Sequence, residues 1–82
     1  YILKLSNSKY YIGSTSNLPQ RLQVHSSGKS KYTSKFLPFE VVFTQEFKDY
    51  SKARKAEFWL KKLKNREIVE RIISDKKILK EF

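Results

Sequence analysis

The sequence contains no cysteine, which excludes a disulfide framework and any zinc site built on cysteine. It contains one histidine, so neither a histidine-rich metal site nor a Cys–His catalytic dyad can form. There are only two glycines, and no glycine-rich phosphate loop. No apolar run approaches the ~20 residues that a membrane-spanning helix needs, and no secretory signal is visible. We therefore expect a cytoplasmic protein with no membrane partner.

Acidic residues are also scarce. The chain has 18 Lys and Arg against 8 Asp and Glu, a net charge of +10. Residues 1–66 hold 14 of the basic and 4 of the acidic residues, whereas residues 67–82 hold four of each. A localised basic excess predicts a polyanionic partner, most often nucleic acid, because cations neutralise phosphates and release counterions. The alternative is a lysine-rich surface that only keeps the protein in solution.

The 82 residues, 39% hydrophobic and 15% aromatic, predict one small domain over residues 1–82 with a modest core. Tyr1 already lies in a β-prone run and is not a methionine, so we expect a few residues to precede it in the complete protein.

Hydrophobic periodicity predicts a small sheet with helices. The β-prone runs 1–5 and 10–13, joined by the polar turn 6–9, predict an antiparallel hairpin, and the run 39–47 adds a third strand. Helices are expected over 17–28, 51–64 and 67–74, with a short last helix over 76–82. Asn17 or Ser16 is the expected cap of the first helix, and Gly28 is expected at its end.

The first expected helix carries polar groups on the side that meets the core. Arg21 and His25 share a face with Leu18 and Leu22. Burying an unpaired charge is costly, so Arg21 should have a partner or face a cleft. The alternative is an arginine that reaches to solvent beside a core histidine with satisfied hydrogen bonds.

The second expected helix has an apolar stripe at helical spacing, formed by Ala53, Ala56, Leu60 and Leu63. Glu57, the only acid on this helix, falls within or at the edge of that stripe, where a carboxylate needs a cation or a metal. The alternative is an i,i+4 pair with Lys61, worth about 0.2–0.5 kcal/mol. We expect Trp59 to pack against the next helix.

The segment 29–38 is predicted to be a basic loop. Lys29, Lys31 and Lys35 alternate with Tyr32 and Phe36, a pattern that suits phosphate contacts and base stacking. An ordinary solvated loop with one or two buried aromatics fits the same pattern.

The residue types in the whole chain leave one kind of hydrolytic chemistry open. It is phosphodiester cleavage by one divalent ion held on a carboxylate, with Tyr or His near the attacking water and Arg or Lys near the phosphate.

An ordered series of short motifs runs through residues 1–66. They are Tyr1 leading into Ile2-Leu3, Tyr11-Ile12-Gly13, the run 14–22, the Arg21-to-His25 spacing, His25-Ser26-Ser27-Gly28-Lys29, Tyr32-Thr33, Pro38-Phe39 and Ala53 followed by Glu57 and Lys61-Lys62. In this series the chain resembles the GIY-YIG endonuclease superfamily, in particular its small standalone bacterial members. The glycine of the first half-motif lies outside the sequence.

The resemblance implies an α/β (α+β) fold with a three-stranded antiparallel sheet flanked by helices. It also implies hydrolysis of DNA phosphodiesters with one Mg²⁺ or Mn²⁺ ion, nonspecific or structure-selective, by a monomer without a small-molecule cofactor, in a setting such as DNA repair. A nucleic-acid-binding module with weak or no catalysis is the second hypothesis. A protein-interaction domain is the third.

The resemblance also implies roles for individual residues. Tyr11 would activate the attacking water, and Tyr1 would line the same pocket. Arg21 would stabilise the phosphate, and His25 would support Tyr11 or the water. Glu57 would be the only protein ligand of the metal. Gly13 would supply pocket backbone, approached by a ligand or by the next helix. The expected DNA contacts are Lys29, Lys31, Lys35, Lys61 and Lys62. Asn65 receives no role.

Overall fold

Strand β1 (Ile2–Lys4) lies at the centre of a three-stranded antiparallel sheet in the computed structural model, which describes residues 1–82. Strand β2 (Tyr10–Ile12) pairs with one edge of β1, and β3 (Glu40–Phe43) pairs with the other. The predicted sheet is confirmed. The third strand is shorter than the expected run 39–47, and the side chain of Gln45 beyond it accepts a hydrogen bond from the backbone of Ile78.

The hairpin register settles a question that the sequence left open. Leu3 lies opposite Tyr11, so Tyr1 and Tyr11 project from the same face of the sheet. The ladder extends one pair further, because the backbone nitrogens of Tyr1 and Gly13 donate to each other's carbonyl oxygens at 2.8 and 3.0 Å. Tyr1, Tyr11 and Gly13 are thereby held in fixed relative positions.

Helix α1 (Leu18–Ser26) follows β2 after a short polar turn. The side chain of Asn17 accepts a hydrogen bond from the backbone of Gln20, which confirms the predicted cap, and Pro19 stands in the first turn, where its missing N–H is not needed. Gly28 follows the helix with a φ of +78°, as a residue in this position commonly does. The basic loop after it contains one short 3₁₀ helix, η1 (Thr33–Phe36).

Helices α2 (Tyr50–Leu63) and α3 (Arg66–Asp75) begin and end within one residue of the predicted bounds. Asp49 caps α2 by accepting from the backbone of Lys52, and Asn65 caps α3 by accepting from the backbone of Ile68. Asn65 therefore has a structural role that motif spacing did not reveal. None of these helices is both long and apolar enough to cross a lipid bilayer.

The expected last helix over 76–82 is absent, and that prediction is wrong. Lys76 takes a left-handed conformation with φ of +59°, and the chain continues as a non-helical tail. A seven-residue helix gains little by itself, whereas the extended tail buries Ile78 in the core. The ring of Trp59 lies 5.7 Å from that of Phe82, so the tail is a neighbour of Trp59 that the sequence did not predict.

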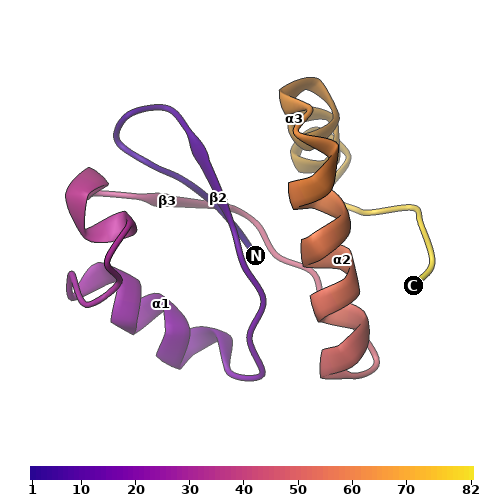
Figure 1. Cartoon of the computed structure of the whole chain (residues 1–82), viewed down its shortest axis with the longest axis horizontal. Helices are drawn as coiled ribbons and strands as arrows, with labels where there is room; N and C mark the ends of the chain where they lie inside the picture. The colour runs from indigo at the N-terminus through magenta and orange to yellow at the C-terminus, as the bar shows by residue number, and fades with distance from the viewer.

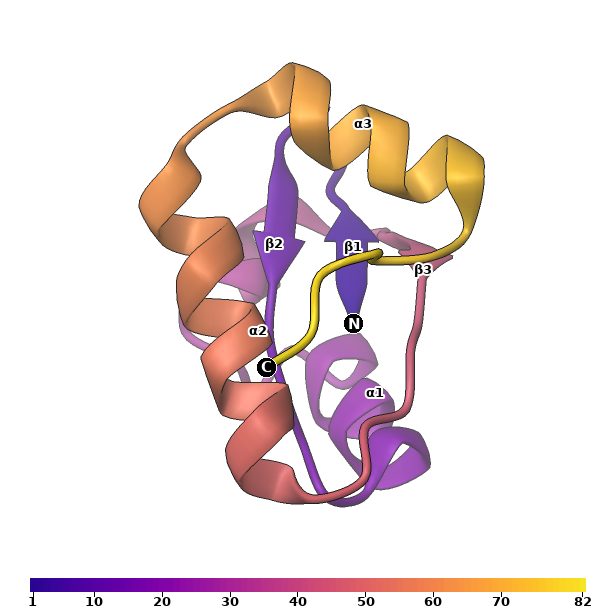
Figure 2. The same cartoon turned by 90° about the vertical axis from the view of Figure 1, so that its right-hand side faces the viewer.

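Both faces of β1 are covered, since Ile2 and Leu3 are almost fully buried. Figure 1 shows α1 and η1 on one side of the sheet and α2 and α3 on the other. Figure 2 shows α2, α3 and the tail in front of the sheet, with α1 behind it. On the α2 and α3 side the core consists of Ile2, Phe43, Leu60, Val69, Ile72 and Ile78. The C-terminal end of β2 therefore lies between the two helical layers.

Candidate active site

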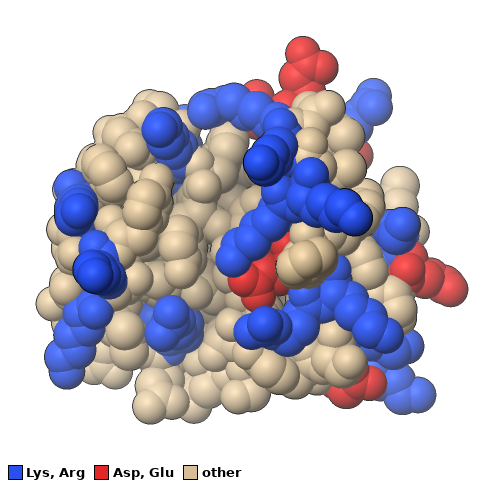
Figure 3. All heavy atoms as spheres, viewed as in Figure 1, with Lys and Arg blue, Asp and Glu red and all other residues tan.

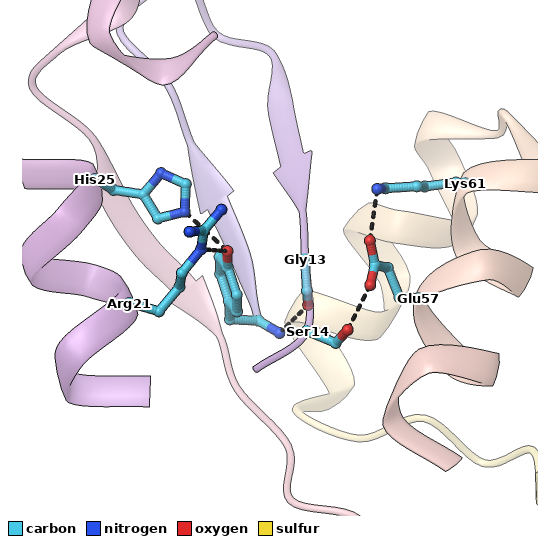
Figure 4. A network of polar contacts seen from close by, with 7 residues as sticks. Gly13, Ser14, Arg21, His25, Glu57 and Lys61 are labelled. Carbon is cyan, nitrogen blue, oxygen red and sulfur yellow. Dashed lines mark hydrogen bonds and ion pairs between the residues drawn. The ribbon is translucent and has the colours of Figure 1, made fainter. Parts of the chain in front are cut away.

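The candidate site lies where β2 ends and the chain turns into α1. Figure 4 shows Arg21 and His25 from α1 on one side, Glu57 and Lys61 from α2 on the other, and Gly13 and Ser14 between them. A polar pocket of about 340 Å³ opens here. Its ten lining residues are Tyr1, Tyr11, Gly13, Ser14, Thr15, Ser16, Arg21, Tyr50, Arg54 and Glu57.

Four of the five residues expected to be catalytic line this pocket, and the fifth lies directly behind it. His25 is fully buried, and its Nε2 lies 2.8 Å from the hydroxyl of Tyr1. Arg21 donates from Nε to the same hydroxyl at 3.4 Å. The polar face of α1 is thereby explained, because Tyr1 is the shared partner of both side chains. His25 meets Tyr11 only edge-on, with ring centroids 5.1 Å apart.

Burial and Arg21 set the protonation states on this side of the pocket. Burial, helped by the charge of Arg21, lowers the pKa of His25 below its ordinary value. Burial raises the pKa of the Tyr1 phenol, and the opposing hydrogen bond from Arg21 does not cancel this effect. The hydrogen bond to Tyr1 raises the pKa of Arg21. At neutral pH the site therefore holds a neutral imidazole and a neutral phenol beside a charged guanidinium.

On the opposite side, Glu57 is held by two donors. Ser14 donates from Oγ to Oε1 at 2.5 Å, and Lys61 donates from Nζ to Oε2 at 2.6 Å. Burial alone would raise the pKa of Glu57, but these two hydrogen bonds and the charges of Lys61 and Arg54 outweigh it, so the pKa is lowered. The i,i+4 pair with Lys61 is thus present, and Glu57 faces the pocket at the same time.

The donor set limits which metal the pocket suits. No group of three or more His, Cys, Asp or Glu side chains lies together. Glu57 is the one acid on the pocket wall, and its side chain is 15% exposed. A hard ion that keeps most of its waters, such as Mg²⁺, needs only one or two carboxylates and takes its other ligands from water and phosphate. The residues present fit one such ion.

Gly13 contributes to the site by having no side chain. A β-carbon at position 13 would lie 2.5 Å from Cζ and Oη of Tyr1, closer than such contacts occur. The close approach expected at this glycine is real, and within the protein the group that approaches is the ring of Tyr1 and not the next helix. Gly13 therefore allows the Tyr1 ring to reach His25 and Arg21.

None of the predicted DNA-contacting lysines lines the pocket. Lys29, Lys31 and Lys35 are exposed on the η1 side, Lys61 lies beside Glu57, and Lys62 is exposed on the outer face of α2. Figure 3 shows basic side chains on both sides of the hollow that separates the two helical layers. The segment that carries η1 contacts the pocket wall, since the ring of Tyr32 stacks on that of Tyr11 with centroids 6.0 Å apart.

Sequence reasoning gave no site role to six residues of this region, although four of them lie within its motif series: Ser14, Thr15, Ser16, Thr33, Tyr50 and Arg54. Arg54 had a usable signal, because it precedes Glu57 by three positions on a helix and so shares its face. Ser14 begins the motif run 14–22, but its contact with Glu57 spans 43 residues of sequence and could not be predicted from spacing.

Comparison with known proteins gives consistent matches. The family model described as the GIY-YIG catalytic domain matches residues 1–71. The UPF0213 protein YazA of Bacillus subtilis is 35% identical over 82 residues, 99% of this chain and 82% of its own. A UPF0213 protein of Oceanobacillus iheyensis is 42% identical over 64 residues, covering 77% of this chain and 74% of its own. No solved structure matches.

Proposed function

This chain belongs to the GIY-YIG catalytic-domain family, a nuclease superfamily, and from that premise we propose that it is a metal-dependent endonuclease that hydrolyses DNA phosphodiester bonds. One observation carries the proposal. The two tyrosines, Arg21 and Glu57 come from four separate segments of the chain and line a single polar pocket. A purely structural use of these residues would not require them to share an open, polar cavity.

Tyr11 and Arg21 act on the attacking water and on the scissile phosphate. Tyr11 lines the pocket and activates the attacking water. Arg21, whose guanidinium reaches the pocket from α1, stabilises the charge that develops on the phosphate oxygens in the pentacoordinate transition state. Because Arg21 is anchored on Tyr1, it needs little reorganisation when that charge appears. His25 supports this arrangement through Tyr1.

Glu57 would hold the Mg²⁺ or Mn²⁺ ion, which supplies Lewis-acid stabilisation of the phosphate and a more acidic bound water. Ser14 and Lys61 keep the Glu57 carboxylate ionised and fix its orientation toward the pocket. Lys61 and Arg54, beside the same carboxylate, add positive charge where the DNA backbone would lie.

The exposed lysines on the two sides of the pocket would contact the flanking DNA backbone. Lys29, Lys31 and Lys35 serve one side, and Lys61 and Lys62 serve the other. Contacts of this kind position the duplex without reading its bases. We therefore propose cleavage that is nonspecific or selective for DNA structure.

The test is cleavage of a panel of end-labelled DNAs, linear, nicked, flapped and branched, with Mg²⁺, with Mn²⁺ and with a chelator. We expect cutting that needs the metal and that falls by about 10²-fold or more in Glu57→Gln, which keeps the shape of the side chain and removes its charge. Glu40→Gln, the same change on the exposed edge of the sheet, is the matched control and should cut like the parent. Equal cutting by both variants would contradict the proposal and point to a contaminating nuclease.

The second candidate is a DNA-binding module on the same fold. It is favoured by one observation, that both carboxylate oxygens of Glu57 already have protein donors, as in a structural ion pair. A folded protein that binds DNA with strong salt dependence but never cuts it, with either metal, would establish this function.

A further inference from the structure

Thr33, the first residue of η1, places a hydroxyl behind the candidate active site. Its side chain lies outside the pocket, and the residue is fully buried. Oγ1 lies 2.8 Å from Nδ1 of His25, and this contact is the only hydrogen bond of the Thr33 side chain. On the other edge of the imidazole, Nε2 lies 2.8 Å from the Tyr1 hydroxyl. Thr33, His25 and Tyr1 therefore form a chain that runs from the buried core to the pocket.

The direction of the hydrogen bonds along this chain follows from donor counting. A neutral imidazole has one N–H, and either ring nitrogen can carry it. If Nδ1 carried the proton, Thr33 would only accept, and its own buried hydroxyl proton would have no partner. If Nε2 carries the proton, the Thr33 hydroxyl donates to Nδ1, and both fully buried donors, the Thr33 hydroxyl and the imidazole N–H, have a partner. A buried donor without a partner is costly, so the second arrangement is favoured.

This arrangement determines what the Tyr1 hydroxyl can do. With the proton on Nε2, the Tyr1 oxygen accepts from His25 on one side and from Arg21 on the other. Both lone pairs of the oxygen are then used, and the remaining group is its own O–H, which faces the polar pocket. The opposite tautomer would direct that O–H back into His25 and leave nothing to offer a substrate.

We propose that Thr33 is a positioning residue that holds His25 as the tautomer protonated on Nε2, so that the Tyr1 hydroxyl donates into the pocket, to an oxygen of the substrate phosphate. His25 is then a donor to Tyr1 and not a base that removes its proton. The part that concerns the phosphate rests on the proposed nuclease function, whereas the tautomer does not depend on it. The raised pKa of Tyr1 is consistent with a phenol that keeps its proton at neutral pH.

The tautomer can be read directly, because His25 is the only histidine in the chain. Long-range ¹H–¹⁵N correlation spectra of uniformly ¹⁵N-labelled, metal-free protein at pH 7.5 contain a single set of imidazole signals. We expect an unprotonated nitrogen at Nδ1 and a protonated one at Nε2. A protonated Nδ1, or a rapid average of the two tautomers, in the parent protein overturns the proposal without any enzyme assay.

Two substitutions distinguish the hydrogen bond that the Thr33 hydroxyl donates from the packing of its side chain. Thr33→Val keeps the shape of the side chain and removes its donor, and Thr33→Ser keeps the donor and removes a methyl group. We expect Thr33→Val to weaken the Nε2 preference, because Nδ1 then accepts no hydrogen bond, and to lower the cleavage rate about tenfold; Thr33→Ser should retain both. A folded Thr33→Val protein with the parental tautomer and parental cleavage rate overturns the role of Thr33. If the parent shows the Nε2 tautomer but cuts no DNA, the nuclease function and the phosphate contact fail while the tautomer assignment stands.

Discussion

The ring of Tyr1 lies so close to the backbone of Gly13 that no other residue fits at position 13 without displacing it. A β-carbon there would come within 2.5 Å of Cζ and Oη of Tyr1. The same two residues pair through reciprocal backbone hydrogen bonds. The hairpin therefore fixes the ring on the strand side, while His25 and Arg21 fix its hydroxyl on the helix side.

Gly13→Ala should remove cleavage and lower the free energy of unfolding by about 1–3 kcal/mol, the usual cost of forcing an extra carbon into a packed site. The Tyr1 ring can escape the new methyl group only by leaving His25 and Arg21. Urea unfolding and a cleavage assay measure the two effects. Gly28→Ala is the control, because nothing lies near its β-carbon and only its φ of +78° is unfavourable. It should cost about 1 kcal/mol and leave cleavage intact.

Stability should fall as the pH drops below about 6.5, the ordinary pKa of histidine. The folded protein lowers the pKa of His25, so the unfolded chain binds a proton first, and acid favours unfolding. The stabilisation is complete above the unfolded pKa and is lost progressively down to the folded pKa. Urea midpoints of the parent and of His25→Asn, measured from pH 7.5 to pH 5, test this. A slope that persists in His25→Asn would assign the effect to another group.

Asn65→Ala should lower the free energy of unfolding by about 1 kcal/mol, because it removes the side-chain acceptor for the backbone N–H of Ile68 at the start of α3. Cleavage by the folded variant should not change. Asn65→Asp, which keeps an acceptor, should restore the stability. Loss of cleavage in a stable Asn65→Ala protein would show that this residue belongs to the catalytic site.

Replacing Lys29, Lys31 and Lys35 together by glutamine should weaken DNA binding and flatten its salt dependence. If all three contact phosphates, the slope of log K against log salt should become less negative by about 2.7, since each phosphate contact contributes about 0.9. Fluorescence anisotropy with chelator present measures binding without cleavage. The control is Lys76→Gln with Lys77→Gln, in the charge-neutral C-terminal segment, and it should leave the slope unchanged.

The sequence by itself determined the local features. The cap at Asn17, which acts on a backbone group three residues away, was predicted, and the bounds of α2 follow from periodicity within the helix. The cap at Asn65 is equally local but was missed. The motif series indicated the family and the residues expected to line the pocket. Their catalytic roles stay predictions, as do the single-ion mechanism, the contacts with DNA and the monomeric state.

Only the tertiary structure decided which distant groups meet. The pairs Thr33–His25, Ser14–Glu57 and Tyr1–Gly13 depend on strand register and on how α1 and α2 pack against the sheet. The same holds for the tail, where a helix was expected and burial of Ile78 prevailed over local helix propensity. Local hydrogen bonding and periodicity are encoded within about four residues. The long-range contacts depend on the packing of the whole chain, which no short stretch of sequence specifies.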